Sequence, residues 1–258
     1  MGEIVGAAVV SHVPPIVLPE EVRRELTDGE ESSLVPGLHR LRAECLDRLG
    51  ADTFVVFDTH WFTLVEMVVT SHGRRTGNYT SDELPSGMPA MPYDIPGDPE
   101  LAEAEAPASV AADHDCGTAG ADDFELWGRL LGEAIESLDR RVVLLASGGL
   151  SHRFWPLNVF RDHESSSLDN IITPEAQAAD ETIIARREAG AHAAVIDGYS
   201  EFRAHAPEGL FGHYLMMVGA LGGRDCRAPG IAYSDYEAAA GTGQIHMWFE
   251  RPDSGWTA

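Results

Sequence analysis

Three histidines in this 258-residue chain each follow a short apolar run that is typical of a buried β-strand. His12 follows VGAAVVS, His60 follows FVVFDT and His152 follows VVLLASGGLS. Open α/β sheets place their sites outside the carboxyl ends of the parallel strands, so three such histidines can meet at one edge. A single histidine of this kind more often bonds to backbone in a loop, but the recurrence predicts a metal site or an acid–base site.

A metal site needs a ligand besides two imidazoles. Two histidines and one carboxylate, with open positions opposite them, form the ligand set of non-haem Fe(II) oxygenases. We expect the carboxylate to come from Glu208 in PEGLFGHYLMM, because it opens a helix whose apolar sequence indicates burial. Glu237 in SDYEAAAGTGQ is the second choice and Asp235 the third, since the chain has 42 acidic residues and most must be solvated.

The neighbours of His152 and His114 bear on what these two histidines could do. His152 follows a Gly-Gly-Leu-Ser turn that allows a ligand to approach the backbone closely. His114 in ADHDCG lies between two aspartates, which favour the protonated imidazole and hence a proton donor; an exposed histidine in an acidic loop is an equal alternative. The other histidines lack such context and are expected to be structural or solvated: His39, His72, His163, His192, His205, His213 and His246.

Alternating strands and helices must position these residues. The hydrophobic pattern predicts strands at residues 4–10, 54–57, 142–146 and 64–71. It predicts helices at residues 38–49, 124–138, 174–195 and 214–221. Segment 74–99 is rich in glycine, proline, serine and aspartate, which predicts a long binding loop. We expect an α/β fold: a central, mostly parallel or mixed sheet flanked by helices, in a single layered domain that spans residues 1–258.

The composition excludes several kinds of function. A formal net charge of −24 opposes binding to nucleic acid or to an anionic membrane. All 18 basic residues are arginine, so Schiff-base and P-loop lysine chemistry is excluded. The three cysteines have no CxxC spacing, and we expect reduced thiols in a cytoplasmic protein. The sequence shows neither a signal peptide nor an apolar run of the roughly 18 residues that a membrane span needs.

Five segments in a fixed order resemble the class III (LigB-type) extradiol ring-cleaving dioxygenases. They are SHVPP, FDTHWF, YTSDELPSGMPAMPYDIPGDPEL, LLASGGLSHRF and GTGQ. The likeness runs from about Gly6 to Gln244 and is strongest to the homoprotocatechuate (3,4-dihydroxyphenylacetate) 2,3-dioxygenase branch. Between His114 and Val142 the chain is shorter than that branch, which bears on the substrate.

This resemblance implies Fe(II) held by His12, His60 and Glu208. It makes His152 the acid–base residue and His114 a second pocket histidine, although the family's DHG-like segment here reads DHDCG. The implied reaction opens the ring of a catechol with O2 to a muconic semialdehyde-type product, in one catalytic domain that forms a homo-oligomer.

Substrate recognition and the metal leave alternatives open. A carboxylated catechol would need an arginine, and Arg153 next to His152 is the first candidate, with Arg74 and Arg75 as others. A zinc-dependent DOPA-dioxygenase-like enzyme or a zinc hydrolase on the same scaffold is the alternative function, since three histidine ligands would favour zinc. A non-catalytic member of the fold is the third possibility.

Overall fold

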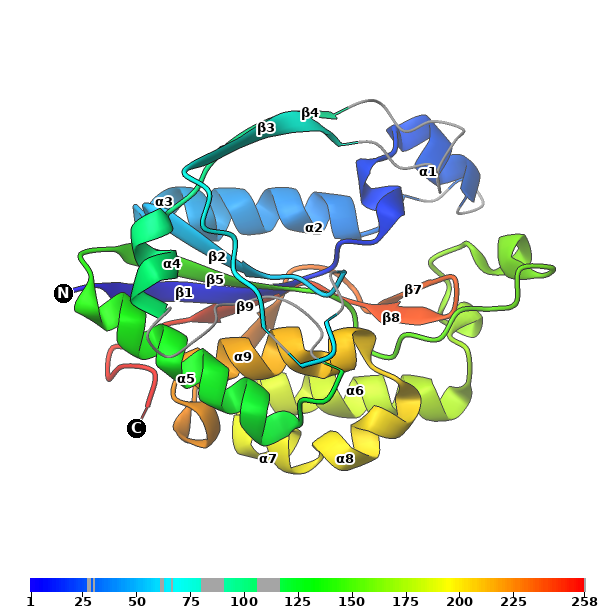
Figure 1. Cartoon of the computed structure of the whole chain (residues 1–258). Helices are drawn as coiled ribbons and strands as arrows, with labels where there is room; N and C mark the ends of the chain where they lie inside the picture. The colour runs from blue at the N-terminus through cyan, green and yellow to red at the C-terminus, as the bar shows by residue number, and fades with distance from the viewer. Residues whose placement is uncertain are drawn as a thin grey trace.

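A mixed sheet between two layers of helices forms the centre of the computed structural model (Figure 1). The structure describes residues 1–26, 29, 31–60, 63–65, 67–79, 91–105 and 117–257. The main sheet has five strands in the order β2-β5-β1-β9-β6. Their bounds are β1 Glu3–Val10, β2 Thr53–Phe57, β5 Arg141–Ser147, β6 Gly230–Ala232 and β9 Met247–Glu250.

Three neighbouring strands of this sheet run in the same direction. Strand β5 lies between β1 and β2 and is parallel to both, whereas β9 is antiparallel to β1. The carboxyl ends of β1, β2 and β5 therefore lie at one edge of the sheet. This edge is where the three strand-following histidines leave the sheet, as the sequence predicts.

Helices cover both faces of the sheet. Their bounds are α1 Glu20–Leu26, α2 Leu34–Leu41, α3 Asp47–Leu49, α4 Pro99–Glu105, α5 Ala121–Ser137, α6 Pro174–Glu188, α7 His192–Asp197, α8 Tyr199–Phe202 and α9 Gly212–Ala220. Helix α2 lies on one face and α5, α6 and α9 lie on the other (Figure 1). Because each face of β1 packs on a separate apolar cluster, β1 is almost wholly buried, as its unbroken apolar sequence requires.

The predicted fold class is confirmed, and most predicted elements match the observed ones to within a few residues. The long helix predicted at 174–195 is wrong in one respect: it is two helices, α6 and α7. Gly190 separates them with a left-handed φ of 65°, at the place where the chain packs against the Arg227 carbonyl. Helix-favouring residues, many of them alanine, continue on both sides of this break, so composition alone joins the two helices.

Two further predictions of local structure are wrong. The described residues of 64–71 form no strand; Leu64 and Val65 are exposed, and the Leu64 carbonyl accepts a hydrogen bond from Thr118 instead. Segment 74–99 is not all loop, because β3 Arg74–Tyr79 pairs antiparallel with β4 Met91–Pro96. Both strands of this hairpin are exposed along their length, so they lack the buried face that makes a strand visible in a sequence.

A second, smaller hairpin packs at the edge of the sheet where the site residues lie. It pairs β7 Glu237–Ala239 with β8 Thr242–Gln244.

In the part of the chain that the structure describes, no helix has both the length and the apolar character that crossing a membrane would require.

Candidate metal centre

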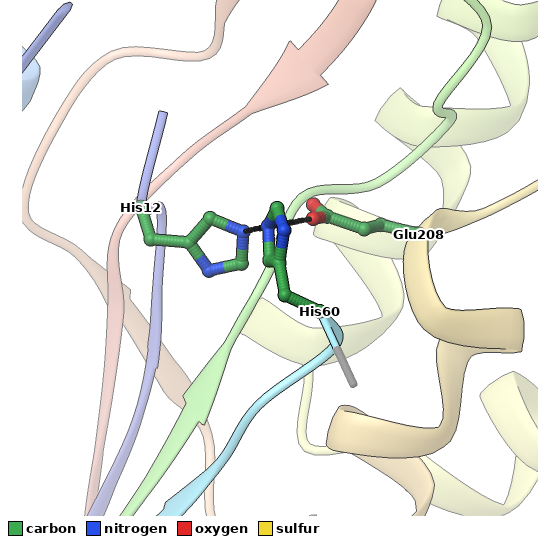
Figure 2. A group of neighbouring side chains, drawn as sticks. All are labelled: His12, His60 and Glu208. Atoms are coloured by element: carbon green, nitrogen blue, oxygen red, sulfur yellow. Dashed lines mark hydrogen bonds and ion pairs between the residues drawn. The ribbon is translucent and has the colours of Figure 1, made fainter. Parts of the chain in front are cut away.

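His12, His60 and Glu208 meet at the carboxyl edge of the sheet (Figure 2). His12 lies two residues after β1 and His60 three residues after β2. Glu208 arrives from the opposite direction, on the turn Glu208–Phe211 that precedes α9. Segments nearly 200 residues apart in the sequence thus supply one cluster.

The three side chains present their ligand atoms to a common point. His12 Nε2 lies 2.8 Å from Glu208 Oε1 and 2.8 Å from His60 Nε2, and His60 Nε2 lies 3.6 Å from Glu208 Oε1. Ligands bound at about 2.1 Å on one face of an ion lie about 3 Å apart, which these separations match. Two imidazole nitrogens this close repel through their lone pairs unless a proton or a cation lies between them. The residues therefore fit a divalent metal held by two nitrogens and one oxygen.

Glu208 is held rigidly on the protein side. Only 7% of it is exposed, and its carboxylate accepts hydrogen bonds from the Gly149 backbone N–H at 2.5 Å and from Thr59 Oγ1 at 2.9 Å. The backbone that follows is left-handed at Gly209, Leu210 and Phe211, with φ of 58°, 50° and 65°. Left-handed non-glycine residues are strained and are concentrated at functional sites. The chain accepts this strain where it turns the carboxylate toward the histidines.

The surroundings of Glu208 keep it charged. Burial alone would raise the pKa of this carboxyl, but the hydrogen-bonded imidazoles of His12 and His60 lower it far below its ordinary value. A carboxylate that stays ionised in a buried position is suited to bind a cation.

His12 is oriented from its other nitrogen. Its Nδ1 lies 2.8 Å from Oγ of Ser147, the last residue of β5. Metal-binding histidines usually bond through the second ring nitrogen in this way, and here the bond holds the ring with Nε2 toward Glu208.

His152 lies beside the cluster, with Nε2 3.7 Å from Glu208 Oε2. Burial lowers its pKa, against the opposing effect of the Glu208 charge, so the imidazole is neutral at pH 7 and able to accept a proton. The exposed ring of Phe154 lies edge-on to it, at 4.7 Å between ring centroids.

Other residues singled out in the sequence lie elsewhere. Glu237 is buried, but it accepts hydrogen bonds from Ser32 and Ser33 near the start of α2, and Asp235 is exposed. Neither joins the cluster of His12, His60 and Glu208, so the structure favours Glu208 among the three carboxylates.

The arginines predicted to bind substrate lie on the surface, and the predicted pocket histidine lies outside the part of the chain that the structure describes. Arg153 is exposed and donates from Nη2 to the Ala204 carbonyl at 2.8 Å. Arg74 is exposed and paired with Asp94, and Arg75 is exposed. His114 lies outside the described residues.

Two residues near the cluster escape sequence reasoning. Thr59 and Ser147 bond to Glu208 and His12, and their only sequence signal is adjacency to the strand ends. His213, expected to be structural, is buried beneath Gly148, where a Cβ would lie 3.0 Å from its ring. Burial lowers the pKa of His213 to about 3, so the ring is neutral.

The fold and the cluster of two histidines and one glutamate agree with the family that the sequence matches. The model of the catalytic LigB subunit of aromatic ring-opening dioxygenases matches residues 6–119 and 114–247. The chain belongs to this family, and the resemblance of its motifs is confirmed. It is therefore a protein of the ring-opening dioxygenase kind.

Two individual proteins extend this result. The chain is 28% identical over 190 residues to the 3,4-dihydroxyphenylacetate 2,3-dioxygenase of Escherichia coli, across 60% of this chain and 68% of that protein. Its fold matches the crystal structure of the uncharacterized protein JW3007 from Escherichia coli K12 with a TM-score of 0.54 and 19% identity, across 95% of this chain and 99% of that one. The second likeness concerns the fold alone.

Proposed function

We propose that this protein is an Fe(II)-dependent extradiol dioxygenase that opens the aromatic ring of a catechol with O2 to a muconic semialdehyde-type product. The observation that carries the proposal is the convergence of His12, His60 and Glu208 within ligand distance of one point, in a member of the ring-opening dioxygenase family. Two histidines and one carboxylate would leave other coordination positions of a bound metal open for a catechol and O2.

The proposed metal ligands are His12, His60 and Glu208. Bound Fe(II) would lower the pKa of a coordinated catechol hydroxyl and supply the redox chemistry of oxygen activation. Ser147 orients the ring of His12, while Thr59 and Gly149 hold Glu208 in place, so the chain presents a preformed ligand set.

His152 is the proposed acid–base residue. It is neutral and lies next to Glu208, so its Nε2 can take the proton of the catechol hydroxyl and return it when the ring opens. His114 is proposed as a second pocket histidine by family likeness. Arg153 follows His152 directly, and its guanidinium has five N–H donors, which suits the carboxylate of a substrate such as 3,4-dihydroxyphenylacetate.

An anaerobic reconstitution with Fe(II), followed by a panel of catechols, tests the proposal. We expect oxygen uptake and a yellow ring-opened product with at least one catechol, and loss of activity after oxidation of the iron. Zinc-loaded protein provides the comparison, because two histidines and a glutamate also bind zinc in hydrolases. Activity with zinc but not with iron, or no oxygen uptake with any catechol, would overturn the proposal.

A further inference from the structure

A second buried carboxylate lies behind the candidate site and takes no part in the metal cluster. Asp180 of α6 is fully buried, and its two oxygens accept three hydrogen bonds. Oδ1 accepts from the backbone N–H of Ser151 at 2.9 Å, and Oδ2 accepts from Ser151 Oγ at 2.7 Å and from Tyr236 Oη at 2.8 Å. Burying a carboxylate is costly, and two of the three hydrogen bonds that compensate Asp180 come from Ser151, so this serine is held firmly.

Ser151 connects the two functional residues. It directly precedes His152 and forms an antiparallel bridge with Pro207, which directly precedes Glu208. On either side of this bridge, the Glu208 N–H donates to the Leu150 carbonyl, and the His152 N–H donates to the Ala206 carbonyl, both at 3.0 Å. The two segments thus form a short ladder that fixes His152 relative to Glu208.

The hairpin of β7 and β8 closes over this carboxylate. Gly243 donates its N–H to the Ser151 carbonyl at 3.0 Å, and a Cβ on Gly243 would overlap the Asp180 carboxylate. Steric contact therefore explains the glycine at position 243 in the GTGQ segment, because only glycine lets this hairpin lie against both Asp180 and Ser151.

We propose that Asp180, acting through Ser151, is a positioning residue that holds His152 and Glu208 at a fixed spacing. For the role of His152, the inference rests on the proposed function. The effect of Asp180 on the position of Glu208 concerns metal binding, so it can be measured without turnover. Asp180 bonds to Ser151 and Tyr236 and lies within electrostatic reach of the buried Arg187, so its effect on His152 and Glu208 passes through Ser151.

The experiment compares two serines whose hydroxyls each donate a hydrogen bond to a buried carboxylate. Ser151→Ala removes a hydroxyl 2.7 Å from a buried carboxylate, and Ser32→Ala removes a hydroxyl 2.7 Å from the buried carboxylate of Glu237, away from the metal cluster. Asp180→Ala and Asp180→Asn form a second pair, because the asparagine oxygen can still accept from the Ser151 N–H. The measurements are kcat and KM with the best catechol, the Kd of the metal-free protein for Fe(II), and amide exchange of residues 148–152.

We expect Ser151→Ala to lower kcat and to weaken Fe(II) binding by about tenfold, with KM changed less than about threefold. Asp180→Ala should lower kcat by about a hundredfold and Asp180→Asn should restore most of it. Amide exchange in 148–152 should accelerate in Ser151→Ala, whereas Ser32→Ala should keep kcat and metal Kd within about twofold of the original protein.

The proposal is overturned if Ser151→Ala matches Ser32→Ala in kcat and in the Kd for Fe(II). This comparison tests the proposal even if Asp180→Ala does not fold. If the unmodified protein cleaves no catechol, the proposed function fails while the metal Kd still tests the positioning role. A Kd for Fe(II) that is equal in Ser151→Ala and Ser32→Ala then overturns it.

Discussion

Glu208 and Glu237 are two buried glutamates with similar immediate partners and different surroundings. Their exposures are 7% and 8%, and each carboxylate accepts a hydrogen bond from one backbone N–H and one hydroxyl. Glu208 also faces the Nε2 atoms of His12 and His60, whereas the bonds of Glu237 go to the segment that begins α2. Burial and hydrogen bonding therefore do not make a carboxylate a metal ligand; the convergence of further ligand atoms does.

The difference also appears in the backbone. Glu237 lies in the regular strand β7, where its conformation costs nothing unusual. Glu208 lies between the left-handed residues Ala206 and Gly209. Left-handed alanines occur near both glutamates, since Ala240 after β7 has a φ of 52°. Only the Glu208 segment has left-handed non-glycine residues on both sides of the glutamate, at Ala206 and at Leu210 and Phe211. This backbone indicates that the position of Glu208 is imposed for a purpose other than folding.

The largest expected effect separates the two glutamates directly. Glu208→Gln should weaken Fe(II) binding by at least about a hundredfold, because it removes the charged ligand, whereas Glu237→Gln should leave the Kd nearly unchanged. Anaerobic titration of the metal-free protein gives both values. The pair contradicts the ligand assignment if Glu208→Gln keeps stoichiometric iron.

His12→Ala and His60→Ala complete this test. Each should lose iron as Glu208→Gln does, since three ligands act together on one ion. A variant of either histidine that binds iron as tightly as the original protein would remove that histidine from the site.

The next effect separates metal binding from proton transfer within the site. His152→Phe should bind iron normally but lose turnover by about a hundredfold, because it removes the neutral imidazole that we propose accepts the catechol proton. Iron content and kcat, measured on the same preparation, check this prediction. An unchanged kcat would exclude His152 from proton transfer.

The sequence predicts the strand-end histidines well, since apolar runs mark buried parallel strands and their carboxyl ends share an edge. The sequence leaves three candidate carboxylates, because spacing along the chain does not show which of them reaches that edge from nearly 200 residues away. The family resemblance favours Glu208, and the left-handed turn after Glu208 explains why no periodic pattern marks its position.

Asp180 and the exposed hairpin show where sequence reasoning fails. Asp180 sits in a helix with many polar residues, and nothing local distinguishes it from a solvated aspartate. Strands β3 and β4 bury neither face, so they carry no alternating pattern. Both features depend on tertiary contacts that a single sequence does not contain.

A third prediction contrasts Asp180 with Glu208. Burial raises the pKa of Asp180 from 3.8 to about 6, whereas the imidazoles lower that of Glu208. Because the folded state holds the Asp180 proton more tightly than the unfolded state, this group's contribution to stability falls as pH rises between these values. Relative to Asp180→Asn, the original protein should therefore lose about 2 kcal/mol of unfolding free energy between pH 4.5 and 7.5. Denaturant titrations of both proteins at the two pH values measure it, and parallel pH dependences would contradict the prediction.

The smallest effect tests the strain that distinguishes the Glu208 segment from β7. Ala206 has a φ of 49°, which costs an L-residue about 1–2 kcal/mol, and glycine adopts this conformation freely. Ala206→Gly should stabilise the protein by about 0.5 kcal/mol after the entropy cost of glycine, and raise Tm by about 1–2 °C. Ala204→Gly, two residues earlier in a right-handed turn, should destabilise it by about 0.5–1 kcal/mol. If both variants lower Tm equally, the left-handed backbone before Glu208 is not strained, and the contrast with Glu237 reduces to the ligand atoms alone.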